Sequence, residues 1–153
     1  MAFHPNGKAA YVVNELSSTL TVFAFSSADA TLRQLQDVRT TPAEFSGDNS
    51  LAEVLVDEAG TFVYVSNRGH DSVAVYAIDP SKNTVSLVEH VASGGKTPWN
   101  IALDPTGSFL FAANRASSNL AVFRVDAKTG RLTSTGEVFD VPEPTCIVFA
   151  PAQ

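Results

Sequence analysis

Apolar and polar residues alternate along most of this chain with a period of two, which is the period of a β-strand. The runs at 62–66, 72–78 and 84–91 show the pattern most clearly, and a fourth run at 52–56 precedes them. β-Branched and aromatic residues dominate these runs, and turn-forming residues separate them. No segment keeps the 3.6-residue period of a helix. The pattern therefore predicts an all-β protein.

The strand pattern recurs three times along the chain. Segments 4–14, 57–67 and 104–114 each carry a glycine turn, an apolar run and a closing asparagine. The matching positions are Gly7, Gly60 and Gly107; Asn14, Asn67 and Asn114; and Phe23, Tyr76 and Phe123. Four strands in a repeat of roughly 40–50 residues are typical of a β-propeller blade. We therefore expect a single partial propeller domain over 1–153, with four-stranded antiparallel blades at 1–40, 51–93 and 98–141.

The repeats leave the predicted ring unfinished. The first blade has only a stub of its inner strand, at 2–4, and an extra inner strand is expected at 145–150. A propeller closes with about 4–8 blades, and open strand edges favour association. The chain is therefore expected to be part of a longer one, or to self-associate as a homodimer or larger assembly. In the second case, the last strand of one copy would complete the first blade of another.

Charge and cysteine content narrow the classes of partner. The chain has 10 basic and 16 acidic residues, a net charge of −6, and no basic cluster, so nucleic acid is not an expected partner. Its apolar stretches are far shorter than the roughly 20 residues that span a bilayer, and the N-terminus lacks the features of a secretory signal. A membrane is therefore not expected either. The single cysteine, Cys146, excludes an intrachain disulfide and favours a cytoplasmic location.

Antiparallel pairing predicts which end of the blades carries chemistry. Pairing outward from the turn at 58–61 places Glu53 opposite Ser66 or Asn67, so the start of the inner strand and the end of the second strand share one end. That end gathers the candidate site residues Glu15, Glu53, Asn67, Arg68, His70, Lys96, Trp99 and Arg115. The opposite end carries ordinary turn residues.

Glu53 is the sharpest anomaly, because it is a carboxylate within an otherwise apolar inner strand. The matching positions of the following repeats hold Asn100 and Cys146. A buried carboxylate needs a partner, and Arg68 is the expected one, either as a structural pair or as part of a site.

Three of the other candidates also have a structural reading. The repeated asparagine, Asn67 among them, suits a corner with positive φ or an Asx turn. His70 could be an ordinary loop residue, and Trp99 could either pack internally or form a stacking platform.

Three other chemistries find no support. Gly95-Lys96-Thr97 resembles the end of a phosphate-binding loop, but His90 stands where that motif needs glycine. The histidines are scattered, so no metal site is expected, and no other cofactor is implied. A Gly-x-Ser-x-Gly elbow is absent from the sequence.

The runs at 10–19, 64–72 and 94–98 closely resemble the lactonase family of seven-bladed β-propellers, which includes propeller-type 6-phosphogluconolactonases and carboxymuconate-lactonizing enzymes. The motif Asn-Arg-Gly-His-Asp-Ser at 67–72 is its most specific part. The resemblance covers essentially this whole chain but only the C-terminal half of a family member. Met1 matches an internal position of that family.

The resemblance implies hydrolysis of a sugar lactone such as 6-phosphogluconolactone, with a lactone or sugar acid as the small-molecule partner. Glu53, Arg68 and His70 would be catalytic: Glu53 or His70 as base, and Arg68 as ligand of a carboxylate, phosphate or developing oxyanion. The remaining candidates would bind substrate. They are Glu15, Asn67, Lys96, Trp99 and Arg115.

One departure bears on the substrate, because many relatives carry arginine where this chain has Trp99. A lost arginine weakens binding of an anion and puts the phosphorylated substrate in question. The alternative function is a non-catalytic propeller fragment, an interaction or structural module that assembles with further copies.

Overall fold

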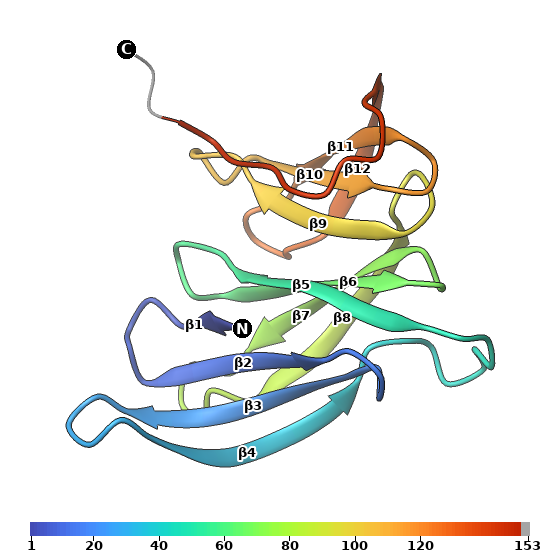
Figure 1. Cartoon of the computed structure of the whole chain (residues 1–153). Helices are drawn as coiled ribbons and strands as arrows, with labels where there is room; N and C mark the ends of the chain where they lie inside the picture. The colour runs from blue at the N-terminus through green and yellow to red at the C-terminus, as the bar shows by residue number, and fades with distance from the viewer. Residues whose placement is uncertain (151–153) are drawn as a thin grey trace.

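The computed structural model describes residues 1–150, and they fold into three four-stranded antiparallel sheets (Figure 1). The first sheet contains β1 (Ala2–Phe3), β2 (Ala9–Asn14), β3 (Thr19–Ser26) and β4 (Thr31–Arg39). The second contains β5 (Ser50–Val56), β6 (Phe62–Arg68), β7 (Ser72–Ile78) and β8 (Val85–Ala92). The third contains β9 (Pro98–Leu103), β10 (Phe109–Asn114), β11 (Asn119–Val125) and β12 (Leu132–Asp140).

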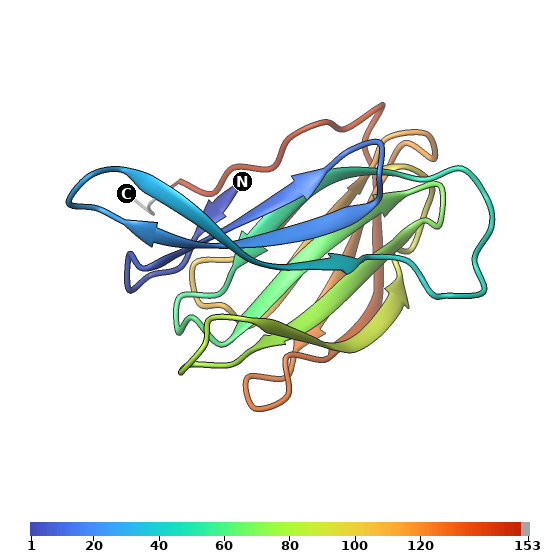
Figure 2. The same ribbon diagram turned by 90° about the horizontal axis from the view of Figure 1, so that it is seen from below.

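These sheets confirm the predicted all-β fold and its partial propeller. In each sheet the strands lie side by side in chain order, as in a propeller blade, and the three sheets stack face to face (Figures 1 and 2). Among residues 1–150 there is no helix long and apolar enough to cross a membrane.

The turn between the first two strands of each blade is set by a repeated glycine. Gly7, Gly60 and Gly107 have φ angles of 68°, 67° and 69°, a region that costs a side-chain-bearing residue energy but not glycine. The turn fixes the register of the strands that follow, and in the second sheet Leu51 pairs with Asn67. The start of β5 and the end of β6 therefore share one end of the blade, as predicted.

The segment 145–150, expected as an extra inner strand, is not in a strand. It runs beside β9 (Figure 1), where the Ile147 N–H donates a hydrogen bond to Asn100 Oδ1 at 2.9 Å. The Phe149 ring packs edge-on against Phe111, with ring centroids 5.4 Å apart. An inner strand is normally held by ladder bonds to the second strand of its own blade, and the described chain holds no such strand for this segment.

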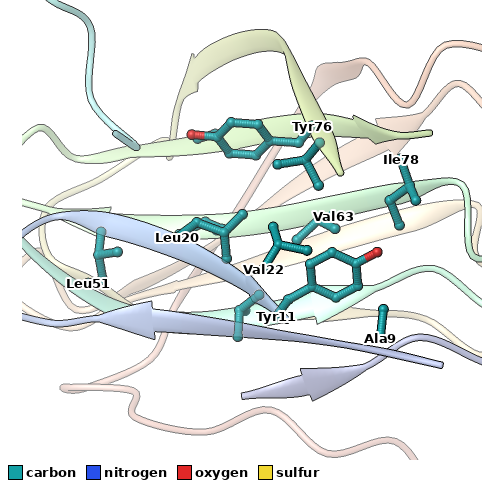
Figure 3. Packing of buried hydrophobic residues seen from close by; sticks show 12 residues of the cluster. Ala9, Tyr11, Leu20, Val22, Leu51, Val63, Tyr76 and Ile78 are labelled. Carbon is teal, nitrogen blue, oxygen red and sulfur yellow. The ribbon is translucent and has the colours of Figure 1, made fainter. Parts of the chain in front are cut away.

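The second sheet is the centre of the core because both of its faces are covered. Along β6, Val63 and Val65 pack toward the first sheet, whereas Phe62 and Tyr64 pack toward the third. Figure 3 shows the first of these two clusters, with Tyr11 and Val22 of the first sheet lying against Val63 and Tyr76 of the second. Each fully buried side chain of this kind contributes roughly 1.5–3 kcal/mol, so packing between blades dominates the stability.

Buried tyrosines add a directional link between neighbouring blades. Tyr11 and Tyr64 occupy matching repeat positions, and each donates its hydroxyl to a carbonyl in the outer turn of the next sheet. The distances are 3.4 Å from Tyr11 to Asn83 O and 3.1 Å from Tyr64 to Gly130 O. Burial raises the pKa of Tyr11 to about 12 and raises that of Tyr64 further. Both hydroxyls therefore stay protonated as donors. The third matching residue is Phe111, which lacks the hydroxyl.

His90 links the outer strand β8 to the first blade. Its Nε2–H donates to the Thr40 carbonyl at 2.9 Å. Burial is the main cause that lowers its pKa, and the neighbouring His70 adds to the effect; the hydrogen bond to Thr40 and the charge of Glu44 oppose it. The neutral imidazole is thus the form that the fold favours.

We expect Tyr64→Phe to lower the free energy of unfolding by about 1 kcal/mol, because it leaves the Gly130 carbonyl without its buried partner. Tyr11→Phe is the matched control, and its longer bond predicts a smaller loss. Urea denaturation followed by circular dichroism measures both variants. A larger loss for Tyr11→Phe would contradict this account.

We expect the protein to lose stability as the pH falls below about 6.5, the ordinary value for histidine. Because the folded-state pKa of His90 is depressed, the unfolded chain binds the proton more readily, and acidification favours unfolding until the folded-state pKa is passed. His90→Gln keeps a donor for Thr40 but does not titrate, so its free energy of unfolding should fall less between pH 7 and 5. Identical pH profiles for the two proteins would show that His90 does not contribute.

Candidate functional site

A pocket of about 390 Å³ opens at the end of the blades where β5 and β9 begin. Its lining comes from all three sheets and from the segment after β12: Glu15, Leu51, Ala52, Glu53, Arg68, Trp99, Asn100, Thr145 and Cys146. These residues occupy a few repeated positions. One is the residue after the repeated asparagine, at Glu15 and Arg68. The others lie at the start of β5 and β9 and at the matching positions after β12. The pocket is therefore at the end of the blades that the sequence predicts.

A β-bulge at the start of β5 and another at the start of β9 aim side chains into this pocket. In the second sheet Leu51 pairs with Asn67 and Val54 pairs with Val65, so the register shifts around Ala52 and Glu53. The third sheet repeats the shift at Trp99, between the pairs formed by Pro98 and by Asn100. A bulge adds a residue to one strand and turns its side chains away from the regular pleat. The same irregularity thus presents both Glu53 and Trp99.

Glu53 is held by neutral donors. Its Oε2 accepts a hydrogen bond from Asn100 Nδ2 at 2.7 Å, and its Oε1 accepts one from the Val54 N–H at 3.2 Å. Its own N–H donates to Ser66 Oγ at 2.9 Å in place of a ladder carbonyl. The carboxylate is therefore fixed in the pocket wall.

The expected ion pair between Glu53 and Arg68 is wrong. Arg68 Nη2 instead bonds Glu15 Oε1 at 2.6 Å and the Leu51 carbonyl at 2.7 Å. The reason is the repeat geometry. Arg68 lies beside Glu15, the matching residue of the preceding blade, while Glu53 lies beside Asn100, the matching residue of the following blade.

Arg68 is a rigid and largely buried cation. Its side chain is 11% exposed, against 61% for Glu15, and its guanidinium carbon lies 4.4 Å from the centre of the Trp99 ring. Its buried Nε has no hydrogen-bond partner in the part of the chain that the structure describes. The arginine is therefore preorganised beside Glu53 on the same pocket.

Trp99 forms a wall of the pocket and contacts two arginines, Arg68 and Arg115. It is 37% exposed, and the Arg115 guanidinium carbon lies 5.1 Å from its ring centre. Arg115 itself is not part of the pocket lining. Arg115 also forms an ion pair with Glu143 at 3.0 Å. The sequence left two roles open for Trp99, internal packing and a stacking platform. Trp99 fits both, since it packs against cations and still presents surface to the pocket.

Asn100, Thr145 and Cys146 line the pocket, although they are not among the site residues predicted from the sequence. Asn100 donates to Glu53 and accepts from the Ile147 N–H, so it ties the segment after β12 to the carboxylate. The signal was available, because Asn100 and Cys146 occupy the repeat positions that match Glu53.

His70, predicted as catalytic, does not line the pocket. Its ring packs against Phe45 at 4.8 Å and against His90 at 5.9 Å between centroids, and its Nδ1 lies 2.7 Å from Ser72 Oγ. The loop 42–49 turns the histidine away from the pocket. This loop can approach because Gly69 has no Cβ. A Cβ at this position would collide with the Asp48 carbonyl.

Asn67 and Lys96, predicted to bind substrate, also lie away from the pocket lining. Asn67 is fully buried, and its amide bonds Thr40 and Ser72. Lys96 is exposed, and its N–H donates to Ser117 Oγ at 2.8 Å.

The side chains of Asn67 and Asn114 are buried and donate to the Thr40 and Ser93 carbonyls, whereas Asn14 is half-buried and donates to Thr19 and Thr21. None of the three has the positive φ that the sequence suggested. Positive φ occurs four residues later in each repeat, at Ser18, Asp71 and Ser118.

The described residues contain no group of three or more His, Cys, Asp or Glu side chains that could hold a metal ion. The chemistry available at the pocket is that of a fixed carboxylate, a fixed guanidinium and an aromatic wall.

Comparison with known proteins places this arrangement in a family. The family described as Lactonase, 7-bladed beta-propeller matches residues 1–149. A Bacillus subtilis protein named 6-phosphogluconolactonase is 38% identical over 149 residues, which are 97% of this chain and 43% of the relative. The chain thus spans less than half of that relative, and its correspondence to the C-terminal half stays a prediction.

Solved structures share the fold closely. The periplasmic gluconolactonase PpgL of Pseudomonas aeruginosa superposes with a TM-score of 0.89 at 33% identity, over 94% of this chain and 40% of that one. A protein from Lactobacillus plantarum gives a TM-score of 0.92 at 30% identity, over 95% and 42%. The chain therefore belongs to the lactonase family of seven-bladed β-propellers, and it spans part of the length of its relatives.

Proposed function

We propose that this chain carries a lactonase site that hydrolyses a sugar lactone. The observation that carries the proposal is the placement of Glu53 and Arg68 on one pocket of about 390 Å³, each fixed by its own hydrogen bonds. The names of two similar proteins, a 6-phosphogluconolactonase and a gluconolactonase, support this reaction class.

The proposed reaction needs a base and a group that stabilises negative charge. Glu53 takes a proton from a water molecule as the water oxygen bonds to the lactone carbonyl carbon. Arg68 stabilises the negative charge that develops on the carbonyl oxygen. The bond from that carbon to the ring oxygen then breaks, and the departing oxygen takes the proton from Glu53, which leaves a free sugar acid.

Glu53 is favoured over His70 as the base because only Glu53 lines the pocket. Asn100 would act as a positioning residue, since its amide orients the carboxylate. We also propose a reducing cytoplasm as the location, on the ground that the one cysteine, Cys146, is an exposed free thiol.

We expect Glu53→Gln to lower kcat for a sugar lactone by at least about 10²-fold, the usual contribution of a positioned general base. The amide keeps the size of the side chain but cannot accept the proton. Lactone hydrolysis followed by acid release at constant pH measures the effect. Glu58→Gln, in an exposed turn at the opposite end of the blade, is the matched control. Background turnover by the wild type would overturn the enzyme proposal, and equal turnover by wild type and Glu53→Gln would remove Glu53 from the mechanism.

A second candidate function is a propeller module that assembles with further copies, and an open apolar face of the third sheet favours it. Phe109, Phe111, Val122 and Phe139 line a hollow of about 400 Å³ on this face. Phe109, Phe111 and Val122 occupy the repeat positions of Phe62, Tyr64 and Val75. In the second sheet, those three residues pack against the third sheet. The open face is therefore built to receive another blade.

The complementary surface lies on the first sheet, and we propose that a second copy supplies it. The first-sheet residues Phe3 and Leu32 occupy the repeat positions of Leu103 and Leu132. In the third sheet, Leu103 and Leu132 pack against the second sheet. Phe3 and Leu32 are each 47% exposed. Head-to-tail docking would repeat the contact that already joins the second and third sheets, and two copies would supply six blades.

We expect the 153-residue chain to sediment as a dimer or larger species at micromolar concentration. Phe139→Asp should shift it toward monomer, because a charge then lies in the docking face. Leu87→Asp is the matched control, since Leu87 is 52% exposed and Phe139 is 50% exposed. A strictly monomeric wild type would overturn self-association.

A further inference from the structure

The pocket carries more negative than positive charge. Two carboxylates line it, Glu15 and Glu53, against one cation, Arg68. Glu15 offsets the charge of Arg68 from 2.6 Å, whereas Glu53 is bonded by the neutral amide of Asn100. The negative charge of Glu53 is therefore not neutralised by an ion pair, because Arg68 is paired with Glu15.

The other candidate cations do not correct this balance. Arg115 lies over Trp99 and is paired with Glu143 at 3.0 Å. Lys96 is exposed to solvent, and neither residue lines the pocket. A phosphate group, by contrast, carries about −1.5 to −2 charges at pH 7 and is usually held by several free Arg or Lys donors.

The remaining walls suit an uncharged ring. Trp99 presents an aromatic surface, and Leu51 and Ala52 add apolar surface next to it. The apolar C–H faces of a sugar ring can pack on such a wall, while its hydroxyls can bond Glu15 and Asn100. One cation beside the carbonyl then serves the single negative charge of the transition state.

We infer that the pocket takes an uncharged sugar lactone and discriminates against lactones that carry a phosphate. The inference rests on the proposed lactonase function and names its substrate class. It assigns the discrimination to the charge balance of Glu15, Glu53 and Arg68 and to the wall formed by Trp99.

Trp99 makes the inference directly measurable, because it is the single tryptophan of the chain. Its fluorescence reports occupancy of the pocket without any need for turnover. Suitable probes are 1,5-anhydroglucitol and its 6-phosphate, which share a ring, lack the lactone bond and differ in charge. We expect saturable quenching by the uncharged ring and at least tenfold weaker binding of the phosphate.

Two charge variants locate the cause. Glu15→Gln releases Arg68 from its ion pair and should narrow the binding ratio between the two probes by at least threefold. Glu58→Gln makes the same change of charge in an exposed turn at the opposite end of the blade and should leave the ratio unchanged.

The outcomes separate this inference from the reaction on which it rests. Equal or tighter binding of the phosphate, or no Trp99 response to either ring, overturns the substrate class. Hydrolysis assays with gluconolactone and 6-phosphogluconolactone then test the reaction. Faster turnover of the phosphorylated lactone would also overturn the inference but would support the lactonase. Binding of the uncharged ring without hydrolysis of either lactone would overturn only the lactonase.

Discussion

Face-to-face packing of neighbouring sheets is the constraint on which the rest of this structure depends. An antiparallel sheet can leave one face to water, but the second sheet carries apolar residues on both faces, and burying them stabilises the fold. In the second sheet, Val63 and Val65 are covered by the first sheet, and Phe62 and Tyr64 by the third. The hydroxyls of Tyr11 and Tyr64 add one directional link at each of the two junctions, because each donates to a carbonyl in the outer turn of the neighbouring sheet.

The candidate site follows from the same constraint. Stacked repeats bring matching positions of neighbouring blades side by side, so the site consists of pairs between equivalent residues. Glu15 meets Arg68, and Glu53 meets Asn100. The bulges at the start of β5 and of β9 present Glu53 and Trp99 to the pocket. A small number of substitutions at repeated positions can therefore place opposite charges, an amide or an aromatic ring around one pocket.

The sequence predicted the strands, the turns and the end of the blades where the pocket lies, because each depends on local rules. Period-two alternation specifies a strand, and Gly60 specifies its turn. Partners across blades were harder to predict. The predicted pairing of Glu53 with Arg68 was wrong because it was based on two residues of the same blade. The actual partners, Glu15 for Arg68 and Asn100 for Glu53, stand at the matching repeat positions of the neighbouring blades. The position of His70 depends on Phe45 in the loop 42–49, and nothing in the repeat specifies that contact.

Pairing between matching positions also explains how the segment after β12 contributes to the site without being a strand. Asn100 needs an acceptor for its amide hydrogen and a donor for its oxygen, because a partly buried amide left unpaired is costly. Glu53 supplies the first and the Ile147 N–H supplies the second. The segment thus completes a row that runs from Glu53 through Asn100 to residue 147. The Asn100 amide contacts both the carboxylate and the segment that contributes Thr145 and Cys146 to the pocket wall, so the geometry of the carboxylate and the closure of the pocket are coupled through Asn100.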